Sequence, residues 1–296
     1  MASAKTKTLA ILHTAVFLAG WTGIFGRLIS LSGLPLVWYR MMVSLAVLAI
    51  VLLLMGKLQK VSRRQFLQIA GCGGILSLHW VFFYASIQAS NVSVGVACIA
   101  TSSFFTTLFN PIVNRKRIQW VEVLISFIAI IGVLLIFTLD IRYRLGIALG
   151  LLSAALYALF ALLNVNVASF TGKDSANMLF YELMGGVIFL TLIMPLFTRI
   201  ISPETAIIPG KTDIIWLLVL GSVFTILPFL FQLHALRSLS AFTVSLTYNL
   251  EPLYSIAFAA ILFGEQREVS WSFWIGMALI IISVIIQTRR VLGQKS

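Results

Sequence analysis

Long apolar stretches alternate along the chain with short segments that carry charges and turn residues. These segments are Gly56-Lys57, Arg63-Arg64, Arg115-Lys116-Arg117, Asp140-Ile141-Arg142, Thr171-Gly172-Lys173-Asp174, Pro203 to Asp213 and Glu265 to Glu268. A helix needs about 20 apolar residues to cross a bilayer. The pattern therefore predicts an all-α membrane protein with ten transmembrane helices, at residues 8–31, 34–55, 66–88, 91–113, 119–139, 145–168, 176–199, 213–236, 240–263 and 271–288.

The same pattern of residues occurs twice. Residues 84–117 align with residues 234–267 at a constant offset of 150, and Trp38-Tyr39-Arg40 aligns with Phe180-Tyr181-Glu182 at an offset of 142. Five spans fit into each copy, and an odd number of spans inserts the second copy upside down. We expect two inverted five-helix repeats, at residues 1–141 and 142–290, and a cytoplasmic tail at 291–296. Inverted repeats are typical of secondary transporters.

Composition excludes a water-soluble fold. Hydrophobic residues make up 60% of the chain, charged residues make up 10%, and the mean hydropathy is +1.04. Ordinary soluble domains hold about 25% charged residues. Ten spans leave only short loops, so the expected environment of the chain is a lipid bilayer.

The formal charge of +12 agrees with this topology. With the N-terminus inside, the cytoplasmic segments hold fourteen Lys and Arg residues and the outer loops hold five, whereas Arg27 and Arg40 lie within spans. The positive-inside rule then places both termini in the cytoplasm of a multi-pass protein of the cell inner (plasma) membrane. A nucleic-acid partner is not expected, because the pattern leaves no soluble basic face.

Glu251 lies about eleven residues into the ninth predicted span, roughly 16 Å deep at 1.5 Å per residue. A charged group there costs about 2.5–3.5 kcal/mol on insertion scales. Glu251 therefore has two interpretations: a contact for a substrate amine or a proton site, and a protonated or hydrogen-bonded carboxyl that packs the repeat interface. Pro252 removes the intrahelical partner of the Tyr248 carbonyl and predicts a kink. A freed carbonyl beside a carboxylate can meet an ammonium group, unless a Ser or Thr satisfies it. Asn249 adds an amide at the same depth.

His79 lies about fourteen residues into the third predicted span, again near the midplane. Trp80, Phe83 and Tyr84 surround it on adjacent turns. An aromatic wall with one imidazole suits a zwitterion or a planar solute. The alternatives are a hydrogen-bonded packing histidine and rings that face lipid. The residues that we expect to bind the substrate are His79, Trp80, Phe83 and Tyr84 of the third span and Tyr248, Asn249 and Glu251 of the ninth.

Arg40 and Glu182 occupy matching positions of the two copies with opposite charge. Because the second copy is inverted, Arg40 is expected near the outer surface of the membrane and Glu182 near the inner surface. We therefore do not expect the two side chains to pair. Arg40 has two interpretations, a role in the cavity and snorkelling to the outer surface. Glu182 is too short to snorkel and requires a polar partner. We assign both residues, with Pro252 and Pro228, to coupling or gating.

Polar residues near the span ends have two interpretations. Asn164 and Asn166 lie close to the cytoplasmic end of the sixth span, where they either line an entry vestibule or cap the helix. Gln232 has the same two interpretations. Pro228 frees the carbonyl of Phe224 in the eighth span, as Pro252 does in the ninth.

Catalytic, metal and cofactor sites are not predicted. HExxH, P-loop and GxSxG patterns are absent from the sequence, which argues against an enzyme. Cys72 and Cys98 fall inside spans and are interpreted as packing residues. The run Gly71-Cys72-Gly73-Gly74 also lies within a span and predicts close helix packing.

These residues resemble the EamA-type drug/metabolite transporters. The resemblance covers nearly the whole chain and rests on the two five-span repeats, on Arg40 early in the second span, and on Asn249-Leu250-Glu251-Pro252. His79-Trp80 followed by Ser90-Asn91-Val92-Ser93-Val94-Gly95 is similar to the branch that contains amino-acid exporters of the YddG type. The family often has a second Glu-Pro pair in the fourth span, where this chain has Thr101-Ser102, which puts in doubt any mechanism that needs an acidic residue in both repeats. The resemblance implies export of small metabolites through a cavity between the repeats.

The sequence thus predicts a secondary transporter that exports small neutral or zwitterionic metabolites, amino acids first, by alternating access. The alternatives are a facilitative or multidrug/nucleoside exporter of the same fold and a non-transporting membrane receptor. The expected partners are a small-molecule substrate and the lipid bilayer. The sequence leaves open whether the chain is a monomer or a homodimer.

Overall fold

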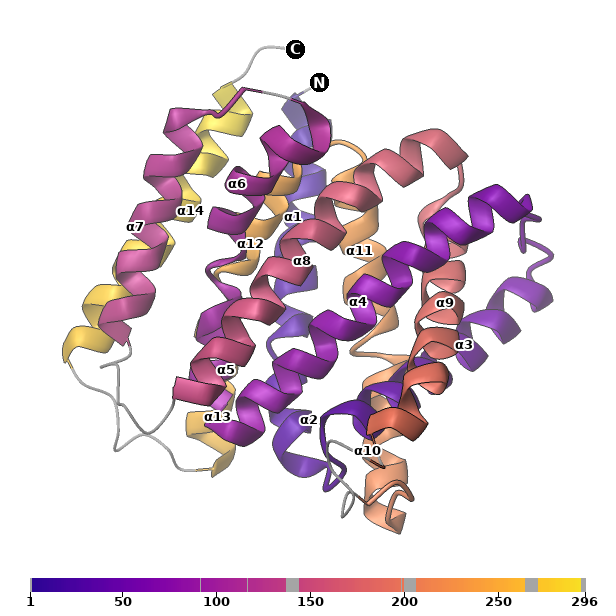
Figure 1. The fold of residues 1–296 in the computed structure, drawn as a ribbon. Coiled ribbons are helices and arrows are strands. Elements are labelled where there is room, and N and C mark those ends of the chain that lie inside the picture. The colour runs from indigo at the N-terminus through magenta and orange to yellow at the C-terminus, as the bar shows by residue number, and fades with distance from the viewer. Residues whose placement is uncertain are drawn as a thin grey trace.

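The computed structural model describes residues 2–90, 92–115, 117–136, 144–197, 199, 206–263 and 271–293, and all regular elements within these ranges are helices (Figure 1). The helices are α1 (Ala2–Ala19), α2 (Thr22–Leu28), α3 (Gly33–Leu54), α4 (Arg63–Ala89), α5 (Val92–Ile99), α6 (Ser102–Asn114), α7 (Trp120–Ile136), α8 (Arg144–Thr171), α9 (Ser175–Leu196), α10 (Lys211–Ser222), α11 (Ile226–Leu236), α12 (Ala241–Tyr248), α13 (Glu251–Phe263) and α14 (Trp271–Gly293). In the described ranges, eight helical segments are long and apolar enough to cross a membrane. The all-helical membrane fold is therefore confirmed, whereas the count of ten spans stays a prediction.

Four of the predicted spans are interrupted near their middles, whereas the prolines had indicated such a disturbance only in the eighth and ninth spans. The first is divided into α1 and α2, the fourth into α5 and α6, the eighth into α10 and α11, and the ninth into α12 and α13. The interruptions lie at residues 20–21, 100–101, 223–225 and 249–250. Each predicted span at these places is thus two half-helices that meet inside the apolar layer.

Prolines explain two of the interruptions. Pro252 is the second residue of α13 and Pro228 is the third residue of α11, so both lie in the first turn of a half-helix. Proline is tolerated there because the N–H groups of the first turn have no intrahelical acceptor. The kink expected at Pro252 takes the form of a tight turn at residues 249 and 250, whose N–H groups bond to the carbonyls of Leu246 and Thr247, and α13 begins directly after it.

Hydroxyl side chains satisfy backbone carbonyls beside the interruptions. The Ser255 Oγ donates to the Gly20 carbonyl at 2.5 Å, the Thr101 Oγ1 donates to the Cys98 carbonyl at 2.7 Å, and the Thr225 Oγ1 donates to the Leu220 carbonyl at 2.8 Å. A bilayer interior offers no water to these groups, so interrupted helices need such internal partners.

The helices form one bundle in which α4 packs against both α8 and α9 (Figure 1). On the other side of the bundle α1 packs against α11, and α3 packs against α9 and α10. Helices α7 and α14 run along each other at one edge, and the start of α1 lies on the same side of the molecule as the end of α14. The expected boundary between the two repeats, at residues 141 and 142, lies outside the described residues.

Glycine allows α4 and α9 to approach closely. A Cβ on Gly73 would overlap the backbone carbonyl of Glu182, and a Cβ on Gly185 would overlap Ala70. Gly71, two residues earlier on α4, has nothing within 4 Å of the place where its Cβ would be. The expected close packing of the glycine run is therefore confirmed at Gly73 and does not extend to Gly71.

We expect the substitution Gly73→Ala to lower the free energy of unfolding by about 1–3 kcal/mol, because the added methyl group separates two packed backbones. The matched substitution Gly71→Ala is expected to leave stability unchanged or to raise it by up to about 1 kcal/mol through helix propensity. Thermal unfolding of both variants in detergent measures the difference. Equal effects of the two substitutions would show that the α4–α9 contact is looser than described.

Candidate functional site

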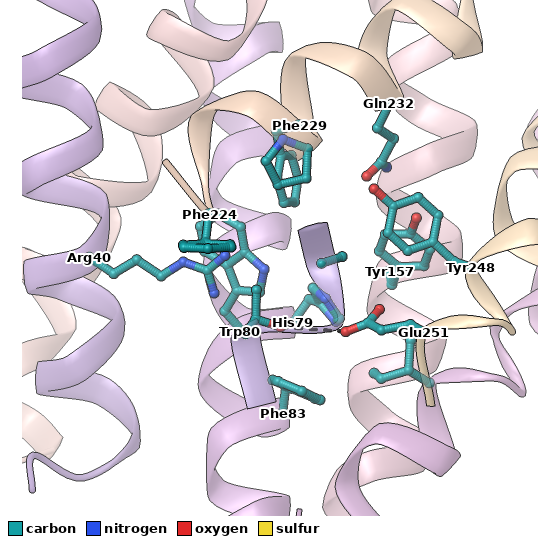
Figure 2. Close-up of a pocket in the computed structure, with 14 residues that line it drawn as sticks. Arg40, His79, Trp80, Phe83, Tyr157, Phe224, Phe229, Gln232, Tyr248 and Glu251 are labelled. Atoms are coloured by element: carbon teal, nitrogen blue, oxygen red, sulfur yellow. Dashed lines mark hydrogen bonds between the residues drawn. The ribbon is translucent and has the colours of Figure 1, made fainter. Parts of the chain in front are cut away.

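A narrow cavity lies where the four interrupted helices meet (Figure 2). At least one residue within or directly beside every interruption lies in its wall, and the uninterrupted helices α3, α4 and α8 supply others. The cavity volume is about 30 Å³, so the lining side chains nearly close the cavity in this conformation. The wall consists of Ala19, Thr22, Arg40, His79, Trp80, Phe83, Ile99, Tyr157, Phe224, Pro228, Phe229, Gln232, Tyr248 and Glu251.

Arg40 of α3 is held at this wall by three contacts. Its Nε donates to the Thr225 Oγ1 at 2.7 Å and its Nη1 donates to the Tyr84 hydroxyl at 3.1 Å. Its guanidinium carbon lies 4.0 Å from the centroid of the Trp80 ring, which is a cation–π contact. Only 1% of Arg40 is exposed. The snorkelling interpretation of Arg40 is therefore wrong, because the side chain is directed into the bundle.

Glu251 begins α13 and points into the cavity from the side opposite to Arg40 (Figure 2). The Thr22 Oγ1 donates to its Oε1 at 3.4 Å. The position at the first residue of a half-helix favours a carboxylate, because the N-terminal end of a helix carries a partial positive charge. The cavity thus holds one cationic and one acidic side chain on opposite walls.

His79 of α4 has a fixed ring orientation. The Ser153 Oγ donates to the His79 backbone carbonyl at 2.8 Å, while the Nδ1 of the ring lies 2.8 Å from that same Oγ and 2.9 Å from the Ser153 carbonyl. Because the hydroxyl hydrogen is committed to the His79 carbonyl, both neighbours of Nδ1 act as acceptors. Nδ1 must therefore carry the proton, which leaves Nε2 as a hydrogen-bond acceptor.

Aromatic rings complete the wall. The Trp80 and Phe229 ring centroids lie 4.9 Å apart, edge to face, and the Tyr157 ring lies 5.1 Å from His79 and 5.7 Å from Tyr248. These separations fall within the range in which aromatic pairs attract each other. The rings therefore support one another and hold the polar groups that they carry in place.

Three of the predicted site residues, Tyr84, Asn249 and Pro252, are not among the residues that line the cavity. Tyr84 lies behind Arg40 as its hydrogen-bond partner. Asn249 donates from Nδ2 to the Ser103 Oγ of α6 at 3.3 Å, and Pro252 follows it in α13.

Glu182 also lies outside the cavity wall. It is fully buried, and it accepts a hydrogen bond from the Nδ2 of Asn164 on α8. This pairing supplies the polar partner that Glu182 was expected to need. Both sequence interpretations of Asn164, a vestibule residue and a helix cap, are therefore wrong.

The sequence analysis missed several residues that line the cavity. Tyr157 lies in the middle of an apolar span, where its hydroxyl was the one available signal, because a buried tyrosine usually finds a hydrogen-bond partner. Thr22 and Phe224 flank interruptions that have no strong local signature. Thr225, which fixes Arg40, was likewise not singled out.

The wall is suited to reversible binding. It offers opposite charges, one imidazole acceptor and several aromatic faces. Within the described residues, the His, Cys, Asp and Glu side chains form no group of three that could hold a metal ion.

Comparison with known proteins gives consistent matches. Residues 6–138 and 144–289 each match the sequence profile described as the EamA-like transporter family. An uncharacterized transporter, YxxF, of Bacillus subtilis is 23% identical over 95% of this chain and 92% of the relative. A probable sugar phosphate/phosphate translocator of Arabidopsis thaliana is 26% identical over 76% of this chain and 74% of its own length. One solved crystal structure, 15% identical, has the same fold with a TM-score of 0.72 over 95% of this chain and 98% of that chain.

The tautomer assigned to His79 can be observed directly. The chain contains three histidines, so ¹⁵N-histidine labelling gives three imidazole signals, which His13→Gln and His234→Gln variants assign. We expect the His79 ring to be protonated at Nδ1 and not at Nε2, and we expect Ser153→Ala to release this preference. Protonation at Nε2 in the unsubstituted protein would contradict the described hydrogen bonds.

Proposed function

Because this chain belongs to the EamA-like transporter family, we propose that it is a secondary transporter that exports small zwitterionic or neutral metabolites, amino acids first, across the inner membrane. Family membership makes the chain a membrane transporter of the drug/metabolite group. The substrate, the direction and the mechanism are the proposed part.

The opposed charges of Arg40 and Glu251 are the observation that carries the choice of substrate. An amino acid holds a carboxylate and an ammonium group a few ångströms apart, and it would present the first to Arg40 and the second to Glu251. Neutralising both buried charges at once makes binding favourable for a zwitterion. An apolar solute would leave both charges without a partner.

The Arabidopsis relative raises phosphorylated compounds as a second class of substrate. A phosphate group would gain the Arg40 contact, and it would also lie in the same narrow cavity as the Glu251 carboxylate. Like charges in a site of low dielectric repel each other strongly. The arrangement therefore favours a zwitterion over a phosphate ester. A transport assay should include a sugar phosphate among the substrates that it tests.

Alternating access is the proposed mechanism, with two inverted repeats that rock about the cavity. In the order of spans within each repeat, the first span is α1 with α2 in one copy and α8 in the other. The third span is α4 in one copy and α10 with α11 in the other. The contact of α1 with α11 is then the counterpart of the contact of α8 with α4. The contacts α3–α9 and α7–α14 are then each their own counterpart. Helices α1 and α8 also run in opposite directions (Figure 1). This exchange of partners is what two inverted copies of one unit would produce.

Transport of amino acids into proteoliposomes tests the proposal. We expect the unsubstituted protein to exchange radiolabelled amino acids, and we expect Arg40→Gln and Glu251→Gln each to reduce the exchange at least about tenfold, because each leaves the opposite charge unpaired. The matched controls are Arg290→Gln and Glu122→Gln, which alter an ion pair of 3.5 Å between α14 and α7, away from the cavity.

The controls should retain exchange. Equal losses in all four variants, or exchange of sugar phosphates in preference to amino acids, would overturn the assignment of substrate. Stimulation by a pH gradient that disappears in Glu251→Gln would show proton coupling. Flux that is independent of the gradient in both proteins would show a facilitative transporter.

The proposed topology predicts a labelling pattern. Cys72 and Cys98 are buried, so single cysteines can be introduced into the native chain. We expect Lys60→Cys, before α4, to react with an impermeant maleimide from the cytoplasmic face, and Lys211→Cys, at the start of α10, to react from the outer face. Reaction of both cysteines from the same face would contradict the inverted arrangement.

A further inference from the structure

A second group of polar side chains lines the cavity apart from Arg40 and Glu251. It consists of Tyr157 of α8, Tyr248 of α12 and Gln232 of α11, which lie together on the side away from Arg40 (Figure 2). They are 2%, 4% and 0% exposed, respectively. Both phenol oxygens and both polar atoms of the amide lack a hydrogen-bond partner among the described residues.

Such a concentration of unpaired groups requires an explanation. Leaving a buried polar group without a partner is costly, and buried polar side chains in folded proteins nearly always have a partner. Other buried side-chain atoms without a partner among the described residues, such as the Asn249 Oδ1, the Glu182 Oε2 and the Gln287 Oε1, occur one to a residue and outside this cavity wall. At this cavity, by contrast, Gln232 has no partner for either polar atom, and the unpartnered phenols of Tyr157 and Tyr248 line the same space.

The surrounding structure holds these groups in position. Tyr248 is the last residue of α12, directly before the interruption at 249–250. The Tyr157 ring packs between His79 and Tyr248, at 5.1 and 5.7 Å. Gln232 lies one turn beyond Pro228 on α11, and Pro228 lines the same cavity. The polar atoms are therefore presented by packed elements and not by mobile loops.

The chemistry of the three groups defines their ligand. A phenol hydroxyl donates and accepts, and a carboxamide has two donors and one acceptor, so the group is neutral and of mixed character. A carboxylate would leave the amide oxygen without a donor, and an ammonium group would leave the amide hydrogens without an acceptor. A neutral group that both donates and accepts, namely a hydroxyl or a carboxamide, can satisfy all three side chains.

We propose that Tyr157, Tyr248 and Gln232 form a side-chain subsite that selects substrates bearing a hydroxyl or carboxamide group. This inference rests on the proposed function, in which Arg40 and Glu251 hold the carboxylate and the ammonium group of an amino acid. The subsite then decides among amino acids by their side chains.

The selection arises from the cost of unpaired groups. An apolar side chain of the same shape would fill the subsite, displace water from it and leave the three polar groups without partners. Sites built to bond a polar group reject the analogue that lacks it far more strongly than apolar pockets reject an extra methyl group. We therefore expect discrimination between substrates of nearly identical shape.

Two pairs of nearly isosteric amino acids test the subsite, threonine with valine and asparagine with leucine. Inhibition of radiolabelled exchange in proteoliposomes gives an apparent affinity for each. The unsubstituted protein should prefer the polar member of each pair at least about tenfold. Tyr248→Phe, Tyr157→Phe and Gln232→Leu should each reduce that preference about fivefold or more, chiefly by weakening the binding of threonine and asparagine.

Tyr39→Phe is the matched control, because Tyr39 packs beside Trp38 on α3 and is not among the cavity-lining residues. It should leave both preferences unchanged. Thermal unfolding without substrate establishes that each variant folds, and the three single substitutions carry the test independently of one another.

The outcomes separate this inference from the proposed function. Exchange of threonine and valine with equal affinity would overturn the subsite and leave an amino-acid transporter standing. A preference that persists in all three folded variants would do the same. If the unsubstituted protein exchanges none of the four amino acids, both the proposed function and the subsite fall.

Discussion

The absence of water from the bilayer interior is the constraint on which this structure depends. Backbone N–H and C=O groups there must find partners within the protein, so a helix can be interrupted only where side chains or an internal cavity receive the freed groups. Four spans are nevertheless interrupted, and residues beside all four interruptions line one cavity. The cost of interrupting the helices is thus concentrated at the place where a ligand would bind. Hydroxyl groups reduce this cost, as the Ser255 hydroxyl does by donating to the carbonyl of Gly20.

The two charged side chains of the cavity also join distant parts of the chain. Arg40 of α3 donates to Thr225, which lies in the interruption between α10 and α11, and Glu251 of α13 accepts from Thr22 of α2. Each charge is therefore tied to an interruption in the other half of the chain. Under the proposed mechanism, a substrate that engages both charges would act on the contacts that hold the two halves together, which links binding to rearrangement.

Polar groups in this bundle serve two different purposes. One carboxyl oxygen of Glu182 accepts from Asn164 at the close contact of α4, α8 and α9, where Gly73 lets the backbones meet, and the other oxygen has no partner among the described residues. The groups of Tyr157, Tyr248 and Gln232 have no such partner in the described structure and share a cavity. Three residues with unpartnered groups at one cavity therefore differ from a single unpartnered oxygen at a packing contact.

Much of this protein could be predicted from the order of its residues. Apolar stretches of spanning length determine a helical membrane fold, and His79, Trp80 and Glu251 were identified as cavity candidates because polar and aromatic groups near the midplane are costly unless they line a cavity or are paired. The sequence could not show that Arg40 turns inward, because a long side chain near a span end has two acceptable environments and only the position of Thr225 and Trp80 decides between them. Nor could it show that Tyr157 and Gln232 face the same space as Tyr248. Tyr157 lies 75 positions before Gln232, and Gln232 lies 16 positions before Tyr248. Their meeting depends on how α8, α11 and α12 pack, which local hydrophobic patterns do not encode.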